Sequence, residues 1–174
     1  MNNVFSGRTI LKFKEDFMTE EKIEYDIRFM ERALELAREA AELDEVPVGA
    51  VIVRDGVIIA EAKNGRERGK CATHHAEILA IEEACRTLGG WRLPGTTLYV
   101  SLEPCAMCAG AIINARIPTV VYAASDLRFG AMGSLIDLSE LPFNHKVRVE
   151  RGVMRTEAEN VISAYFRAKR AKLK

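Results

Sequence analysis

Hydrophobic residues recur with helical and with strand-like periods in turn along this chain of 174 residues. A helix is predicted over 26–43, where apolar side chains share one face and Pro47 follows shortly after the end. Two apolar runs, 49–53 and 57–60, flank Asp55-Gly56, which is typical of a two-residue hairpin turn of type I′. The first third of the chain therefore predicts a helix followed by a β-hairpin.

The rest of the chain continues this alternation of helices and strands. The further predicted elements are helices over 75–88, 105–115 and 157–171 and strands over 97–102, 119–123 and 146–151. Alternating periods of this kind predict a single α/β domain. The irregular segment 124–144 contains glycine and is long enough to be functional rather than a plain connector.

Residues 1–17 show no clear pattern that joins the domain, and Met18 offers a second plausible start. We therefore expect a dispensable extension over 1–17 and a single domain over 18–174. The hydrophobic fraction of 48% and the charged fraction of 29% are ordinary for a soluble globular protein. The longest apolar run, 106–113, is far shorter than the roughly 20 residues that span a bilayer, and no secretory signal is recognisable. We expect a cytoplasmic protein with no membrane partner.

Two short motifs at predicted helix starts carry the candidate chemistry. Cys105 and Cys108 are three residues apart, so both sulfurs lie on one helix face near the N-terminus, where the helix dipole favours thiolate. His75 and Glu77 open the other helix. Two thiolates and a neutral imidazole suit a tetrahedral zinc ion that keeps one position open for water. A carboxylate beside that water can move protons to a ring nitrogen and to a departing amine, as hydrolytic deamination requires.

Three simpler interpretations compete with a catalytic zinc centre. The Cys-x-x-Cys pair could be a redox pair, although His75 and Glu77 would then be unexplained. It could be half of a structural zinc site, with Cys71 or His74 as the fourth ligand. His75 could also be an ordinary histidine at a helix start. We favour the catalytic interpretation, because His-x-Glu followed by Pro-Cys-x-x-Cys is more specific than any part alone.

The motifs His75-Ala76-Glu77 and Pro104-Cys105-Ala106-Met107-Cys108 resemble the zinc signature of the cytidine and nucleotide deaminase superfamily. Over about residues 21–170, further segments resemble the bacterial tRNA-specific adenosine deaminases in order and spacing. These segments are 45–51, Asn64, 98–104, 124–126, 130–134, 144–145 and 165–167. The resemblance implies a three-layer α/β sandwich, a mixed five-stranded sheet with helices on both faces, and a homodimer.

The resemblance also implies roles for individual residues. It implies one Zn²⁺ per subunit, with His75, Cys105 and Cys108 as ligands and Glu77 as the proton shuttle. It implies that Asn64 holds the edge of the target adenine, that Asp126 contacts the flanking nucleotide, and that Phe166 and Arg167 engage the anticodon loop. The implied reaction converts adenosine to inosine at the wobble position of a tRNA.

The chain departs from the family pattern just before the histidine motif. The family commonly carries Asp-Pro-Thr-Ala there, whereas this chain has Cys71-Ala72-Thr73-His74. This places two histidines side by side, and we prefer His75 as the ligand because it stands two residues before the glutamate. The usual lysine after the aspartate is Arg128 here, which keeps the charge but changes the geometry.

Charge distribution helps to separate the possible functions. Formal net charge is zero, but the last eight residues, 167–174, hold five Lys or Arg and no acid. This tail is either a solvated helix end or an RNA-binding arm. An arm favours a tRNA substrate over the first alternative, a deaminase of a free guanine- or cytosine-type base or nucleoside. Glu77 argues against the second alternative, a non-catalytic zinc-stabilised RNA-binding module, because a purely structural metal site has no use for it.

Overall fold

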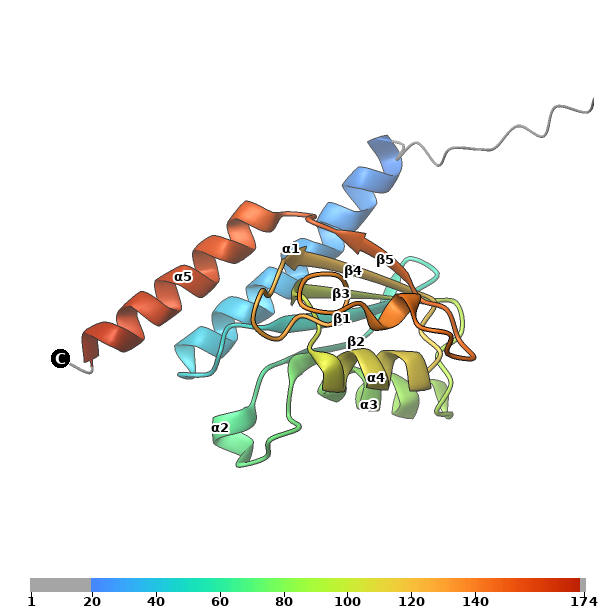
Figure 1. Cartoon of the computed structure of the whole chain (residues 1–174), viewed down its shortest axis with the longest axis horizontal. Helices are drawn as coiled ribbons and strands as arrows, with labels where there is room; N and C mark the ends of the chain where they lie inside the picture. The colour runs from blue at the N-terminus through green and yellow to red at the C-terminus, as the bar shows by residue number, and fades with distance from the viewer. Residues whose placement is uncertain (1–19, 173–174) are drawn as a thin grey trace, which may run out of the picture.

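The computed structural model describes residues 20–172, so the predicted extension over 1–17 lies outside the described residues (Figure 1). In chain order the elements are α1 (Glu20–Glu42), β1 (Gly49–Arg54), β2 (Val57–Lys63), α2 (Arg66–Gly69), α3 (Ala76–Leu88), β3 (Thr96–Leu102), α4 (Ala106–Asn114), β4 (Thr119–Ala124), the 3₁₀ turn η1 (Leu138–Glu140), β5 (Arg148–Arg151) and α5 (Arg155–Lys172). Every predicted helix and strand is present.

The five strands form one mixed sheet in the order β2-β1-β3-β4-β5. Strand β1 is antiparallel to both of its neighbours, and β4 is parallel to both β3 and β5. Strands β2, β3, β4 and β5 therefore all run in the same direction. Their C-terminal ends lie along one edge of the sheet, and this edge is where ligands bind in open α/β sheets.

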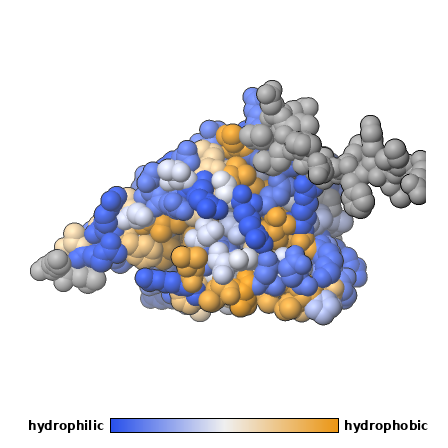
Figure 2. Space-filling view, turned by 45° about the horizontal axis from the view of Figure 1, so that its top comes forward, coloured by the Kyte–Doolittle hydropathy of each residue, from blue (hydrophilic) through white to orange (hydrophobic). Residues whose placement is uncertain are grey.

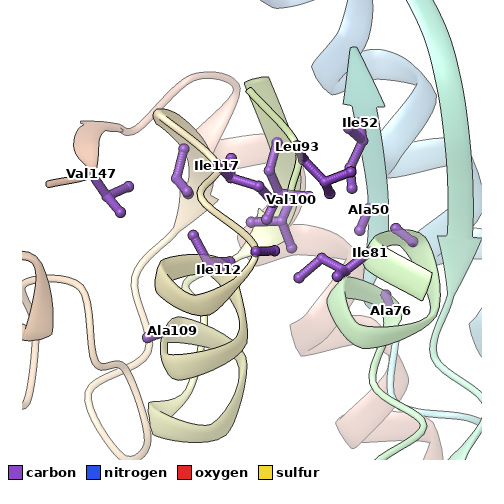
Figure 3. Packing of buried hydrophobic residues seen from close by; sticks show 14 of the residues in the cluster. Ala50, Ile52, Ala76, Ile81, Leu93, Val100, Ala109, Ile112, Ile117 and Val147 are labelled. Atoms are coloured by element: carbon purple, nitrogen blue, oxygen red, sulfur yellow. The ribbon is translucent and has the colours of Figure 1, made fainter. Parts of the chain in front are cut away.

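Helices cover both faces of the sheet, as Figure 1 shows. One hydrophobic cluster packs α3 and α4 against one face, and part of it is drawn in Figure 3. A second cluster packs α1 and the start of α5 against the other face. Side chains of a strand alternate between the faces, so Val120 and Tyr122 of β4 enter the first cluster while Val121 enters the second. The predicted three-layer sandwich is confirmed.

The β-hairpin has the predicted turn. Asp55 and Gly56 both have positive φ, at 50° and 77°, as a type I′ turn requires. Gly89 caps α3 in the left-handed conformation, which explains why this helix ends at the predicted glycine pair.

The two largest differences from the sequence prediction are at α1 and α2. Helix α1 begins six residues before the predicted start, because a helix can continue through polar residues that no apolar period marks. Lys22 there bonds to both Asp26 and Glu150. Helix α2 has only four residues, which is too short to produce a hydrophobic period. Of the helices in residues 20–172, none is long and apolar enough to cross a membrane.

Candidate active site

The predicted site residues converge at the edge of the sheet where the parallel strands end. Asn64 follows β2 directly, Glu103 follows β3, and Asp126 lies two residues after β4. The loop after β3 leads into α4, and the segment after α2 leads into α3, so both of these helices begin at the same edge. Asn64 and Asp126, which are 62 positions apart in the sequence, are thus brought to one edge of the sheet by the strand order.

His75, Cys105 and Cys108 form a compact cluster of metal-ligating atoms. Nδ1 of His75 lies 3.7 Å from Sγ of Cys105 and 3.6 Å from Sγ of Cys108. All three ligand atoms lie within 4.8 Å of one another. His75 is the N-cap of α3 and Cys105 is the N-cap of α4, and neither side chain makes a capping hydrogen bond. Both side chains are therefore free to point into the shared space.

This cluster fits a zinc ion by donor type and by distance. In a tetrahedral zinc site with Zn–S of about 2.3 Å and Zn–N of about 2.0–2.1 Å, nitrogen and sulfur atoms are separated by about 3.6 Å. The observed separations of 3.6 and 3.7 Å match that value. Among the described residues the cluster contains three ligands and no fourth. Three protein ligands leave one tetrahedral position open, as in catalytic rather than structural zinc sites.

The other two candidates for a fourth ligand have different contacts. Sγ of Cys71 lies 3.3 Å from Oγ1 of Thr73. The backbone carbonyl of His74 accepts a hydrogen bond from the N–H of Gly65, and its ring is not part of the cluster. The structure therefore brings His75, and not His74, beside the two cysteines.

Without a metal ion, Cys105 and Cys108 share a hydrogen bond that shifts the pKa values of their two thiols in opposite directions. The hydrogen bond from Cys108 holds the pKa of Cys105 at about 4. The same bond, together with burial, raises the pKa of Cys108. The bond to Cys105 also raises the pKa of His75. A metal ion that binds here must displace these protons, because its ligands bind as thiolates and neutral imidazole.

Glu77 lies in the first turn of α3 and is 3% exposed. Burial raises the pKa of its carboxyl group to about 7. It lines the same pocket as His75 and Cys105. A buried carboxyl group next to a candidate metal centre is a typical acid–base group of an active site.

A pocket of about 940 Å³ opens over this cluster. Its volume lies near the upper end of the roughly 300–1,000 Å³ typical of small-molecule sites. Seven of the eight predicted site residues line it: Asn64, His75, Glu77, Cys105, Asp126, Phe166 and Arg167. Cys108, the eighth, is fully buried and is not one of the lining residues.

Helix α5 forms one wall of the pocket. Its lining residues follow a helical spacing: Glu159, Ile162, Ser163, Phe166, Arg167 and Arg170. Figure 2 shows hydrophilic residues along the arm that this helix forms at the tapering end of the molecule. Phe166 is 40% exposed beside these arginines. The basic tail is therefore not simply a solvated helix end, because one face of it borders the pocket.

Asp126 has contacts of its own within the loop after β4. Its Oδ1 accepts hydrogen bonds from the backbone N–H groups of Arg128 at 2.9 Å and Phe129 at 3.1 Å. These bonds shape the loop that lines the pocket with Leu127, Arg128 and Phe129. Asp126 thus orders the loop, whatever contact it makes with a substrate.

Sequence reasoning missed three residues that build the site. Glu103 is buried and accepts hydrogen bonds from the backbone N–H groups of Asp126, Met132 and Ser134, and so holds the loop after β4. Glu45 is buried and bonds to Asn64. Arg66 lines the pocket. Glu45 and Glu103 stand in the segments 45–51 and 98–104 that resemble the family, and Arg66 stands two residues after Asn64, but no sequence pattern gave any of the three a role.

Comparisons with known proteins place this chain among the deaminases. Residues 24–170 match the family model of the MafB19-like deaminases. The chain is 48% identical over 150 residues to the tRNA-specific adenosine deaminase of Bacillus subtilis (strain 168), with 86% of this chain and 93% of that protein covered.

Two solved structures have the same fold. One comes from a study of A-to-I editing by tRNA:A34 deaminases at the wobble position; it superposes with a TM-score of 0.75 at 46% identity, over 77% of this chain and 98% of that one. The other is a guanine deaminase from Nitrosomonas europaea, with a TM-score of 0.68 at 28% identity, over 80% of this chain and 83% of that one. Through its sequence, its fold and its His-Glu and Cys-Cys motifs, this chain belongs to the tRNA-specific adenosine deaminase family.

Proposed function

We propose that this chain catalyses the hydrolytic deamination of adenosine to inosine at the wobble position of a tRNA. One observation carries the proposal. A buried glutamate and a His-Cys-Cys donor set lie in a pocket whose other walls carry arginines and an exposed phenylalanine. The relatives named for this reaction are similar to the chain over nearly their whole length.

The proposed cofactor is one zinc ion per subunit, held by His75, Cys105 and Cys108. The distances among their ligand atoms and the mixture of sulfur and nitrogen donors support zinc. When bound, zinc supplies a Lewis acid that makes water a nucleophile near neutral pH.

Glu77 is the proposed proton shuttle. Its carboxylate accepts a proton from the attacking water and passes it to the ring nitrogen beside carbon 6 of the adenine. The second proton of the same water goes to the departing amine. A carbon–oxygen bond forms, the carbon–nitrogen bond to the amine breaks, and the net reaction adds water and releases ammonia. Burial of Glu77 excludes bulk water from this exchange.

The pocket walls support an RNA substrate. Four arginines line the pocket: Arg66, Arg128, Arg167 and Arg170. Guanidinium groups attract backbone phosphates, and Phe166 offers a flat surface on which a loop base can stack. An anticodon base is already unpaired, so its extrusion into the pocket costs less than extraction from a duplex. We propose that Asn64 holds the adenine, that Asp126 contacts the flanking nucleotide, and that Phe166 and Arg167 engage the anticodon loop.

A homodimer in the cytoplasm completes the proposal. The segment from Leu127 to Phe143 exposes large apolar side chains, namely Leu127, Phe129, Leu135, Ile136, Leu141 and Phe143. Six large apolar side chains exposed along one segment are typical of an interaction surface. We propose that a second copy of the chain binds to this surface. A cytoplasmic location suits both a tRNA substrate and cysteine ligands that must stay reduced.

The alternative function is deamination of a free base, favoured by the similarity to a guanine deaminase. The test is incubation of the purified, zinc-loaded protein with tRNA transcripts and, separately, with guanine, cytidine and adenosine. We expect inosine at the wobble position, read as guanosine on sequencing, and little turnover of the free compounds. Rapid turnover of a free base without tRNA editing would overturn the tRNA proposal.

A pair of variants on the same helix separates chemistry from folding. Glu77→Gln should remove editing, because the amide cannot accept the proton. Glu83→Gln alters an exposed residue of α3 that pairs with Arg86 and should leave editing unchanged. Equal editing activity of the two variants would show that Glu77 takes no part in the reaction.

A further inference from the structure

Glu45 is a fully buried carboxylate at the end of the turn that follows α1. Its Oε2 accepts hydrogen bonds from Nδ2 of Asn64 at 3.2 Å and from the backbone N–H of Glu67 at 3.2 Å. Its Oε1 accepts a hydrogen bond from the backbone N–H of Arg68 at 2.8 Å. All three partners are donors, so Glu45 acts only as an acceptor.

This arrangement determines which way the Asn64 amide points. A carboxylate that acts as an acceptor can face only the nitrogen end of an amide, because an oxygen there would place two acceptors against each other. One N–H of Asn64 is therefore held by Glu45. Asn64 is 6% exposed and lines the pocket, so its oxygen remains for a substrate in a defined orientation.

The same carboxylate caps the short helix α2. Gly65, the N-cap residue, has no side chain that could bond to the free N–H groups of the first turn. Glu45 bonds to two of these groups from a distant part of the chain. Arg66 lines the pocket, and in the sequence it stands between Asn64 and the two residues whose N–H groups are capped. Glu45 thus holds two neighbouring features of one pocket wall.

We propose that Glu45 is a positioning residue for the target nucleotide: it orients the Asn64 amide so that its oxygen accepts a hydrogen bond from the substrate, and it fixes α2 with Arg66. The donors that an adenosine nucleotide in RNA offers are its exocyclic amine and its ribose hydroxyl. The inference rests on the proposed deamination of tRNA, since it names a determinant of the same pocket.

Catalysis should respond more than binding. Most of the affinity for RNA comes from phosphate contacts, and of the four arginines that line the pocket Glu45 supports only Arg66. If the Asn64 amide points the wrong way, the base binds in the wrong orientation relative to the ligand cluster. Small errors of position reduce the rate of the chemical step. The kcat value should therefore fall while KM changes little.

The test compares Glu45→Leu, whose side chain has no acceptor for the Asn64 amide, with Asp26→Leu as a matched control. Asp26 is also a buried carboxylate, but it accepts a hydrogen bond from Tyr99 in the second hydrophobic cluster and does not line the pocket. Both variants should melt at lower temperature than the wild type. Per zinc-loaded enzyme, Glu45→Leu should lower kcat for editing of a tRNA anticodon stem-loop by about tenfold or more, and Asp26→Leu should not. Equal kcat values for the two variants would show that Glu45 has only a structural role.

The double variant Glu45→Gln with Asn64→Asp tests the direction of the hydrogen bond. Asn64→Asp alone sets two carboxylates against each other and should lose kcat. In the double variant the amide at position 45 donates to the carboxylate at position 64, which still leaves an oxygen toward the pocket. We expect the double variant to recover most of the kcat that Asn64→Asp loses. If it is no more active than Asn64→Asp, when both are folded and zinc-loaded, the contact with position 45 does not orient the oxygen that the substrate needs and the proposal is wrong.

An NMR measurement separates this inference from the proposed function. The side-chain NH₂ signals of Asn64, identified by their absence in Asn64→Ser, should shift in Glu45→Leu and stay in place in Asp26→Leu. Unchanged signals in Glu45→Leu would overturn the orienting bond without reference to any substrate. If the wild type itself does not edit the RNA, it is the proposed function that fails, and the NMR result still decides the hydrogen bond.

Discussion

The hydroxyl of Tyr165 donates a hydrogen bond of 3.0 Å to the backbone carbonyl of Asp44, across 121 positions of the chain. The ammonium group of Lys169 lies 2.8 Å from a carboxylate oxygen of the same Asp44. Within the described part of α5 only Ala158 is buried, so the second half of this helix has little apolar packing to hold it. The contacts to Asp44 therefore hold this half of α5 in position, with its lining residues facing the pocket.

Removal of this contact should weaken RNA binding. The double variant Tyr165→Phe with Lys169→Met loses both bonds to Asp44, so the helix that carries Phe166 and Arg167 can move away from the pocket. We expect a several-fold weaker affinity for tRNA with unchanged zinc content, measured by filter binding and elemental analysis. Deletion of 166–174 should weaken binding further, and wild-type affinity should fall by roughly 0.7 log units per log unit of salt for each phosphate contacted. Full affinity after the deletion would exclude a role for the arm.

Metal content should separate ligands from the proton shuttle. Cys108→Ser should lose most of the zinc, because the thiolate is a ligand, whereas Glu77→Ala should retain the metal and lose editing. His74→Ala should also retain the metal, because the ring of His74 lies outside the cluster. Elemental analysis of the three purified variants checks this assignment. An empty site in His74→Ala, or in Glu77→Ala, would mean that the ligand set is wrong.

Stability in acid should depend on the pair of Arg32 and Glu61. Two guanidinium nitrogens of Arg32 bond to the two carboxylate oxygens of Glu61 at 2.9 and 2.6 Å, and this bond lowers the pKa of Glu61 below its ordinary value of 4.5. Because the folded pKa is the lower one, the stabilisation is present above pH 4.5 and is lost as the pH falls through the folded value.

Arg32→Met should therefore melt about 1–4 °C below the wild type at pH 7. The difference should shrink as the pH falls below 4.5 and through the lowered pKa of Glu61, because the protonated carboxyl group no longer pairs with Arg32. Thermal melts across this range, with Arg38→Met on the same helix as the control, measure the effect. A difference that stays constant with pH would mean that Arg32 stabilises the protein by packing rather than by charge.

The dimer assignment depends on the exposed apolar segment. Leu135→Lys with Phe143→Lys places two charges among residues that are 59% and 45% exposed in the single chain. Because these positions are open to solvent in the monomer, the variant should fold and bind zinc, but it should sediment as a monomer. Analytical ultracentrifugation measures the oligomeric state of the variant. If the variant is still a dimer, the interface lies on another surface.

The extension over 1–17 should be dispensable. A protein that begins at Met18 should melt within a few degrees of the full chain and edit tRNA at the same rate, since the predicted domain starts after this segment. Differential scanning calorimetry and an editing assay of the two proteins compare them directly. A large loss in either measurement would show that the extension contributes to the domain.

The order of elements was predictable from the sequence because it depends on local patterns. The apolar faces of α1 and α3 repeat within a few residues, and the Asp55-Gly56 turn needs only the two conformations that these residues readily adopt. The motifs around His75 and Cys105 were recognisable for the same reason. Each holds its chemistry within four residues at a helix start, where spacing along the chain determines spacing in space.

The sequence did not reveal the residues that hold the site in shape. Glu45 lies 19 positions from Asn64 and Asp44 lies 121 positions from Tyr165, and no local period links them. Their contacts exist because β1 lies between β2 and β3, which places the ends of three parallel strands, and the turn after α1, at one edge of the sheet. Strand order arises from the packing of both faces of the sheet, so only the tertiary structure decides which distant side chains meet there.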